Sequence, residues 1–145
     1  MDLSKTFGTD KDLEKNGAWI DFGEGLFCLI ARSGNPRYNR KFKEVSAPYK
    51  RAIRLETLAD EKAEELMIQV MASTILLDWR GLTDNGVEVP YTPENAKAML
   101  TKYPDFKDQV KSASDSMEAF KRQEIAETEK NSETSSSGSE STESK

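Results

Sequence analysis

The sequence predicts a mainly α-helical protein with a small N-terminal β-hairpin, about four helices and a disordered Ser/Glu-rich C-terminal tail. Three observations support this fold class. Two β-favouring runs meet at a glycine turn, apolar residues then recur every three or four positions, and the last 20 residues lack large apolar side chains. Of the 145 residues, 32% are charged and 36% are hydrophobic, so the chain has enough apolar surface for one modest core.

The N-terminal part predicts the hairpin and the first helix. The two β-favouring runs are residues 18–22 and 26–31, and the glycine-containing connection between them is typical of a hairpin. Asn35 favours the N-cap position and Pro36 the first helical turn, so a helix is expected from there to about Val45.

The middle of the chain carries the longest helical pattern. Apolar residues from Ala52 to Ile75 recur at spacings of three and four, which predicts an amphipathic helix that begins near Pro48. This helix is expected to end at Trp79-Arg80-Gly81, because glycine readily takes the left-handed conformation that follows a helix.

Turn and capping residues predict the remaining elements. Asp84-Asn85-Gly86 predicts a tight turn. Thr92 precedes a proline and predicts the start of a helix that runs to about Lys102, and Pro104 begins a final helix.

The composition divides the chain into three parts. Residues 1–17 are a polar, flexible leader, and residues 18–125 form the helical domain. Residues 126–145 form a disordered acidic tail, in which Ser and Thr occupy half of the positions and five acidic residues face two lysines.

The residue inventory argues against catalysis. The chain has no histidine, one cysteine and no phosphate-binding loop, so no catalytic, cofactor-binding or metal-binding residue is predicted. Cys28 lies in an apolar run and is interpreted as a buried small hydrophobe. A metal-dependent enzyme that uses Asp60-Glu61 or Glu64-Glu65 is the weaker alternative, because a solvated helix face explains these pairs. No membrane-spanning segment or signal peptide is expected.

Charge is strongly segregated along the chain, although the net charge is only −5. Residues 32–54 contain eight basic residues and one acidic residue, with aromatic residues between them, and an acidic block follows. This composition is typical of a nucleic-acid contact, but we favour pairing with acidic residues of the same chain or of a neighbouring copy. The predicted charged pairing surface consists of Arg37, Arg40, Lys41, Arg51, Arg54, Glu61, Glu64 and Glu65.

Two segments resemble a known family. The run Leu77-Asp78-Trp79-Arg80-Gly81 and the later Pro90-Tyr91-Thr92-Pro93-Glu94-Asn95 are similar to the tail assembly chaperones of long-tailed bacteriophages. In that family a long helix ends in Trp and Gly, and a Pro-Tyr-Ser/Thr-Pro-Glu-Asn segment opens the next helix. The resemblance extends over roughly residues 18–122.

The resemblance implies a non-catalytic assembly role without a cofactor. Family members bind the tape measure protein before tail tube protein polymerises around it, and many also exist as a longer frameshifted form. It implies action in the host cell cytoplasm and absence from the mature virion; self-association is possible, and nucleic acid and membrane are not expected partners. A small nucleic-acid-binding or regulatory protein that uses Arg32–Arg54 is the alternative.

An adaptable apolar face would suit such a chaperone, because methionine fits varied partners. The competing interpretation is that the methionines fill the core, and the Trp79 ring is itself expected in the core. The candidate partner-binding residues are Met67, Met71, Trp79, Tyr91, Met99 and Phe106.

Overall fold

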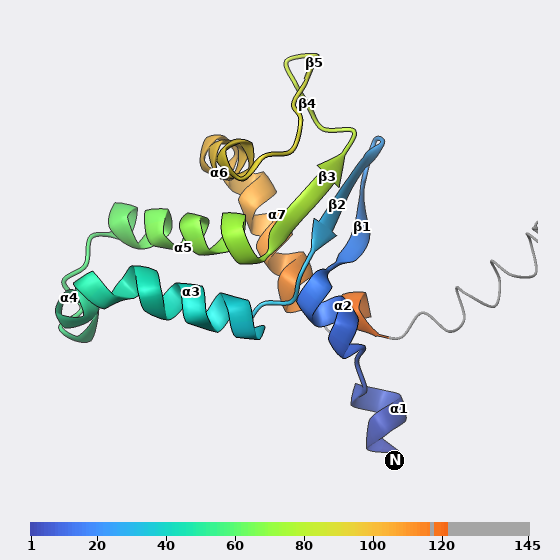
Figure 1. Cartoon of the computed structure of the whole chain (residues 1–145), viewed down its shortest axis with the longest axis horizontal. Helices are drawn as coiled ribbons and strands as arrows, with labels where there is room; N and C mark the ends of the chain where they lie inside the picture. Colours follow the sequence, from blue (N-terminus) through green and yellow to red (C-terminus); the bar gives the residue numbers. More distant parts are fainter. Residues whose placement is uncertain (117, 122–145) are drawn as a thin grey trace, which may run out of the picture. The chain divides into compact units, whose positions relative to one another are not determined.

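The computed structural model describes residues 1–116 and 118–121 (Figure 1). Residues 10–120 form one compact unit. The helix α1 (Leu3–Phe7) belongs to a second unit and is capped by Asp2, whose side chain accepts a hydrogen bond from the Ser4 amide. The predicted flexible leader therefore contains α1 and a second short helix, α2 (Lys11–Asn16). The predicted disordered tail, residues 126–145, lies outside the described residues.

A three-stranded antiparallel sheet lies at the centre of the compact unit. Its strands are β1 (Ala18–Gly23), β2 (Leu26–Ile30) and β3 (Leu76–Arg80), in that order. The predicted hairpin is confirmed, and it turns through Glu24 and Gly25, which both have positive φ. Two such residues in succession give a turn whose twist matches that of the flanking strands.

The predicted mainly helical fold class is wrong, because the structure is mixed, with 58% of the described residues in helices and 17% in strands. The long helix expected from Pro48 to Gly81 is divided into three helices and the strand β3. The helix α5 (Asp60–Thr74) ends where β3 begins to pair with β2. In this register Cys28 of β2 lies between Ile20 of β1 and Trp79 of β3.

The physical reason for this difference is that the last residues of the apolar pattern are compatible with either a helix or a strand. Residues 75, 76 and 79 carry Ile, Leu and Trp, which favour strands as much as a buried helix end. Pairing with β2 supplies hydrogen bonds to a hairpin that would otherwise expose that edge, and tertiary context overrides the local helical pattern.

Three helices and their connection form an arm that extends from the sheet (Figure 1). They are α3 (Pro36–Ser46), α4 (Lys50–Arg54) and α5, with the short 3₁₀ helix η1 (Ala47–Tyr49) between the first two. The predicted start of α3 is confirmed, because the Tyr38 amide donates to the Asn35 side chain at 2.9 Å. The buried Asn35 amide group also donates to the Arg32 carbonyl oxygen at 2.6 Å and so fixes the base of the arm.

The C-terminal half closes over the sheet. A two-stranded hairpin, β4 (Thr83–Asp84) and β5 (Val87–Glu88), turns at the predicted Asn85-Gly86. The helix α6 (Pro93–Lys102) is capped by Thr92 as predicted, and α7 (Pro104–Asp115) and η2 (Glu118–Phe120) follow.

The core lies between one face of the sheet and the helices α5, α6 and α7. Its fully buried large side chains come from both strands and helices: Ile30, Met71, Ile75, Leu76, Leu100, Val110 and Phe120. The other sheet face carries Trp19 and Phe27, each about 40% exposed, and the Arg80 guanidinium lies over the Trp19 ring at 4.1 Å. None of the described helices is long and apolar enough to cross a membrane.

Candidate partner-binding groove

An apolar groove of about 420 Å³ opens between the three helices of the arm. The side chains that line it come from α3, α4, α5 and the connection between the last two. They are Phe42, Val45, Ser46, Ile53, Glu56, Leu58, Asp60, Ala63, Leu66 and Met67. Seven of these ten side chains are apolar, so the groove is suited to another apolar surface rather than to a polar small molecule.

The groove remains open because the arm packs tightly only near the sheet. The C-terminal half of α5 is enclosed, with Leu66, Ile68 and Val70 buried. Towards the tip, by contrast, Phe42 and Ile53 are each 43% exposed and Leu55 is 54% exposed. Large apolar side chains gathered on one exposed element mark an interaction site more often than scattered ones do.

The floor of the groove is held in place by sulfur and aromatic contacts. The Tyr38 hydroxyl donates to the Met67 sulfur at 3.8 Å, and the Tyr38 and Phe42 rings stack with their centroids 6.2 Å apart. These contacts place Met67 at the groove, where its flexible thioether can adapt to a partner.

One residue at the rim has an unfavourable backbone conformation. Glu56 follows α4 with φ of 56°, in the left-handed region that favours glycine. For a residue with a side chain this conformation costs about 1–2 kcal/mol. The amide of Glu56 donates to the Ile53 carbonyl oxygen at 3.1 Å, so the conformation ends α4 and reverses the chain towards α5.

The predicted partner-binding residues are not brought together into one surface. Met71 and Trp79 are buried in the core, and Tyr91, Met99 and Phe106 are half-buried against it. Of the six, Met67 is the residue that lines the groove.

Sequence reasoning missed the residues that give the groove its apolar character. Phe42 is one of the aromatic residues of the basic segment 32–54, and the sequence pattern assigns no role to Ile53 and Leu58. Their signal is present in the sequence, because apolar residues among many charges either pack or bind. Which of the two they do depends on how closely α4 approaches α5.

The predicted charged residues lie on the arm but do not pair with one another as expected within the chain. Across residues 1–116 and 118–121, no ion pair joins the predicted basic residues of α3 and α4 to Glu61, Glu64 or Glu65. Lys41 pairs with Glu44 at 3.5 Å, and Glu64 pairs with Lys107 of α7.

Other charged side chains of the arm also have partners that the prediction did not name. Lys62 pairs with Glu65 at 2.9 Å and lies 5.4 Å from the centre of the Tyr49 ring. The hydrogen bond that the Lys62 ammonium donates to the Glu65 carboxylate raises the pKa of Lys62 and lowers the pKa of Glu65. Arg37 donates to the Lys15 carbonyl oxygen at 3.1 Å and so joins the arm to α2.

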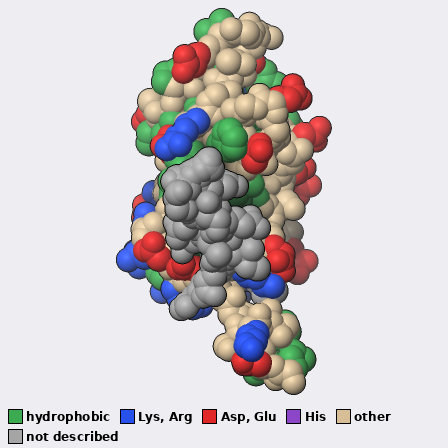
Figure 2. All heavy atoms as spheres, turned by 90° about the vertical axis from the view of Figure 1, so that its right-hand side faces the viewer, with side chains coloured by type: hydrophobic (Ala, Val, Ile, Leu, Met, Phe, Trp, Pro, Cys, Tyr) green, Lys and Arg blue, Asp and Glu red, His purple; other side chains and the backbone are tan. Residues whose placement is uncertain are grey.

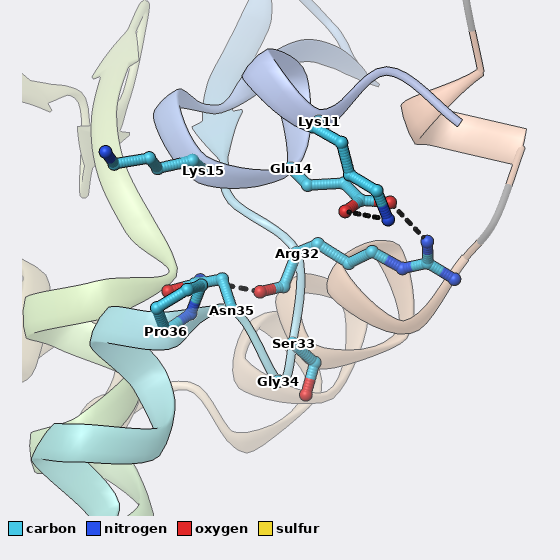
Figure 3. A pocket seen from close by; sticks show the side chains of 8 residues that line it. All are labelled: Lys11, Glu14, Lys15, Arg32, Ser33, Gly34, Asn35 and Pro36. Atoms are coloured by element: carbon cyan, nitrogen blue, oxygen red, sulfur yellow. Dashed lines mark hydrogen bonds and ion pairs between the residues drawn. The ribbon is translucent and has the colours of Figure 1, made fainter. Parts of the chain in front are cut away.

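A second cavity, of about 580 Å³, lies at the start of α3 (Figure 3). Two of its three basic side chains are already paired, because Glu14 pairs with Arg32 at 2.6 Å and with Lys11 at 3.4 Å. Figure 3 shows the Glu14 carboxylate between these two side chains, with Lys15 pointing away. The ion pair between Glu14 of α2 and Arg32 therefore holds α2 against the loop before α3, and the cavity lies at this junction.

The described residues offer no group of metal-ligating side chains. Cys28 is fully buried, and burial raises its pKa from 9.0 to about 12, so its thiol stays protonated at neutral pH.

The side away from the arm carries acidic side chains around the margin of its visible face (Figure 2).

Comparison with known proteins gives one informative result. The model of a family described as YdaY prophage protein matches residues 33–131, a range that includes the whole arm. No curated protein and no solved structure matches the chain. The match supports a bacteriophage origin, and because it covers about two thirds of the chain, this protein belongs to the YdaY prophage protein family.

Proposed function

We propose that this prophage protein is a non-catalytic tail assembly chaperone that binds the tape measure protein and recruits tail tube protein during tail morphogenesis. It would act in the host cell cytoplasm and be absent from the mature virion. The phage family and the resemblance of residues 77–81 and 90–95 to tail assembly chaperones support this proposal. The observation that carries it is the open apolar groove of the arm.

The groove has the properties of a site for an amphipathic helix. Such a helix places apolar residues on one face at spacings of three, four and seven, and that face enters an apolar groove. Phe42 and Ile53 lie at the opening with close to half of their surface in water, so an incoming apolar ridge would bury them. A long helical client that aggregates on its own would expose many such ridges.

The proposal is tested by co-expressing the full chain with the tape measure protein of the same prophage. The parent chain is expected to keep the tape measure protein soluble and to co-purify with it. The double substitution Phe42→Asp and Ile53→Asp places charges in the groove and is expected to abolish co-purification, because a buried unpaired carboxylate is strongly unfavourable.

The control is Val87→Asp, which replaces an apolar side chain that is 67% exposed on β5, outside the arm, by the same acidic residue and adds one negative charge where the groove variant adds two. This variant should retain binding. Loss of co-purification in the control as well, or retention in the groove variant with an unchanged circular dichroism spectrum, would argue against the groove as the client site.

A nucleic-acid-binding role remains the second candidate because of one observation. Arg40, Arg51 and Arg54 are exposed and form no ion pair within the described residues. Free basic side chains on short helices can contact phosphates. Binding of duplex DNA or single-stranded RNA that weakens steeply with salt would favour this role over the chaperone role.

A further inference from the structure

The arm carries most of its basic and most of its acidic side chains on different elements around the apolar groove, with Glu44 on α3 and Lys62 on α5 as the exceptions. The basic wall belongs to α3 and α4 and consists of Arg37, Arg40, Lys41, Lys43, Lys50, Arg51 and Arg54. The acidic wall belongs to the start of α5 and the segment before it and consists of Glu56, Asp60, Glu61, Glu64 and Glu65. The groove is lined from both sides, by Phe42 of α3, Ile53 of α4 and Met67 of α5 among others.

Part of each wall has no counter-charge within the chain. Arg40, Arg51 and Arg54 on the basic wall take part in no ion pair among the described residues. The same holds in this part of the chain for Glu56 and Asp60, which line the groove, and for Glu61. Charges of both signs therefore remain available on the elements that line one apolar groove.

This arrangement is self-complementary. When two identical surfaces meet around a two-fold axis, each contact between a residue of one copy and a different residue of the other occurs twice. A surface with a basic side and an acidic side then places bases opposite acids at both ends of the interface. The exposed apolar residues of the groove, Phe42 and Ile53, would then be covered by the second copy and lose their contact with water.

We propose that the free protein self-associates through the arm, with the basic wall of one copy against the acidic wall of a second copy and the apolar groove buried between them. The occupant of the groove in the free protein is thus a second copy of this chain. The charge complementarity of the two walls supports this occupant over an unrelated protein, whose charges would have no reason to match both sides.

Self-association would regulate access to the groove. A client helix and a second copy would compete for Phe42, Ile53 and Met67, so the groove would be covered until a client displaces the second copy. This competition rests on the proposed function, whereas the self-association does not.

The test measures the oligomeric state of the full chain by sedimentation across a range of concentrations and salt. The parent is expected to form a dimer that weakens as salt screens the charges. Arg51→Glu with Arg54→Glu, and separately Glu56→Arg with Glu61→Arg, should each raise the dissociation constant by about tenfold or more, because like charges then face each other.

Mixing the two variants provides the decisive measurement. The reversed basic wall of one variant faces the reversed acidic wall of the other, so half of the charge pairs have their signs exchanged and the other half are as in the parent. A heterodimer should form with an affinity at least about tenfold above that of either variant alone. The matched control, Lys5→Glu with Lys15→Glu, changes the net charge equally outside the arm and should leave the dimer unchanged.

Thermal unfolding of each variant, followed by circular dichroism, shows whether the arm remains folded. A parent that stays monomeric up to millimolar concentration would overturn the proposal. So would variants that dimerise as tightly as the parent despite the charge reversals, or two variants that do not associate with each other on mixing. Client co-purification that persists while self-association fails would leave the proposed function standing and reject only the self-association.

Discussion

Trp79 is the residue at which the sheet joins the C-terminal helices. Its indole N–H donates to the Val89 carbonyl oxygen at 2.7 Å, and its ring meets the Tyr91 ring edge-on with centroids 5.0 Å apart. The Tyr91 hydroxyl in turn donates to the Leu76 carbonyl oxygen at 2.7 Å. These contacts bind β3 to the segment before α6.

We therefore expect Trp79→Ala to lower the free energy of unfolding by about 3–5 kcal/mol, because it removes a buried aromatic side chain and leaves a cavity. Trp79→Phe should lower it by only about 1–2 kcal/mol, because a smaller aromatic ring still fills most of the site and mainly the indole hydrogen bond to Val89 is lost. Urea unfolding checks both values. An alanine variant as stable as the parent would contradict the buried position of the ring.

Cys28 provides a prediction on pH dependence. The folded protein raises the thiol pKa from 9.0 to about 12, so the unfolded chain releases the proton at lower pH than the folded one does. Stability contributed by the protonated thiol is therefore present below 9.0 and is lost as the pH rises towards 12. The parent should lose about 1 kcal/mol more than Cys28→Ala between about pH 8 and pH 10. Equal losses in the two proteins would show that the thiol titrates normally.

At the scale of elements, two glycines differ in how closely other parts of the backbone approach them: Gly81, which follows β3, and Gly86, in the turn between β4 and β5. Gly81 and Gly86 have nearly equal positive φ values, 78° and 79°. A Cβ atom at Gly81 would lie 2.2 Å from the Gly25 carbonyl oxygen, whereas one at Gly86 would meet open space. The close approach at Gly81 follows from the pairing of β3 with β2.

We expect Gly86→Ala to destabilise the protein by about 1 kcal/mol, the cost of placing alanine in the left-handed region. Gly81→Ala should cost at least about 2 kcal/mol more, because backbone atoms must also move apart. Thermal unfolding compares the two variants under the same conditions. Equal effects would mean that β3 can shift away from the β1–β2 turn without cost.

The basic helices of the arm allow a test against the nucleic-acid role. Under the chaperone proposal, the parent binds DNA and RNA only weakly, and reversing Arg37, Arg40 and Lys41 to Glu leaves the affinity as low as before. Fluorescence anisotropy at two salt concentrations measures this. A micromolar affinity that falls steeply with salt and disappears in the variant would support the nucleic-acid role instead.

At the scale of the whole molecule, the C-terminal segment is predicted from its composition. Residues 126–145 have no large apolar side chain and carry a net charge of −3, so we expect them to add solubility rather than packing. Deleting them should shift the melting temperature by no more than about two degrees and reduce solubility at high concentration. A large fall in melting temperature would show that the segment packs against the folded part.

The sequence by itself determined the features that depend on neighbouring residues. Asn35 and Thr92 cap their helices, and Asn85-Gly86 turns a hairpin, because a side chain or a glycine decides these geometries within a few residues. The first hairpin follows from two β-favouring runs and the glycine-containing connection between them for the same reason. The burial of Trp79 was also expected from its apolar neighbours.

Tertiary structure decided the features that join distant residues. Residues 76–80 become β3 because β2, more than 40 positions earlier, offers hydrogen bonds that a continued helix could not use. Phe42 and Ile53 line a groove because α3, α4 and α5 meet only partly. Within the part of the chain that the structure describes, Arg40, Arg51 and Arg54 form no ion pair with the acidic residues of α5. Helical periodicity shows that a residue has an apolar face, but only the packing of distant elements decides whether that face is covered.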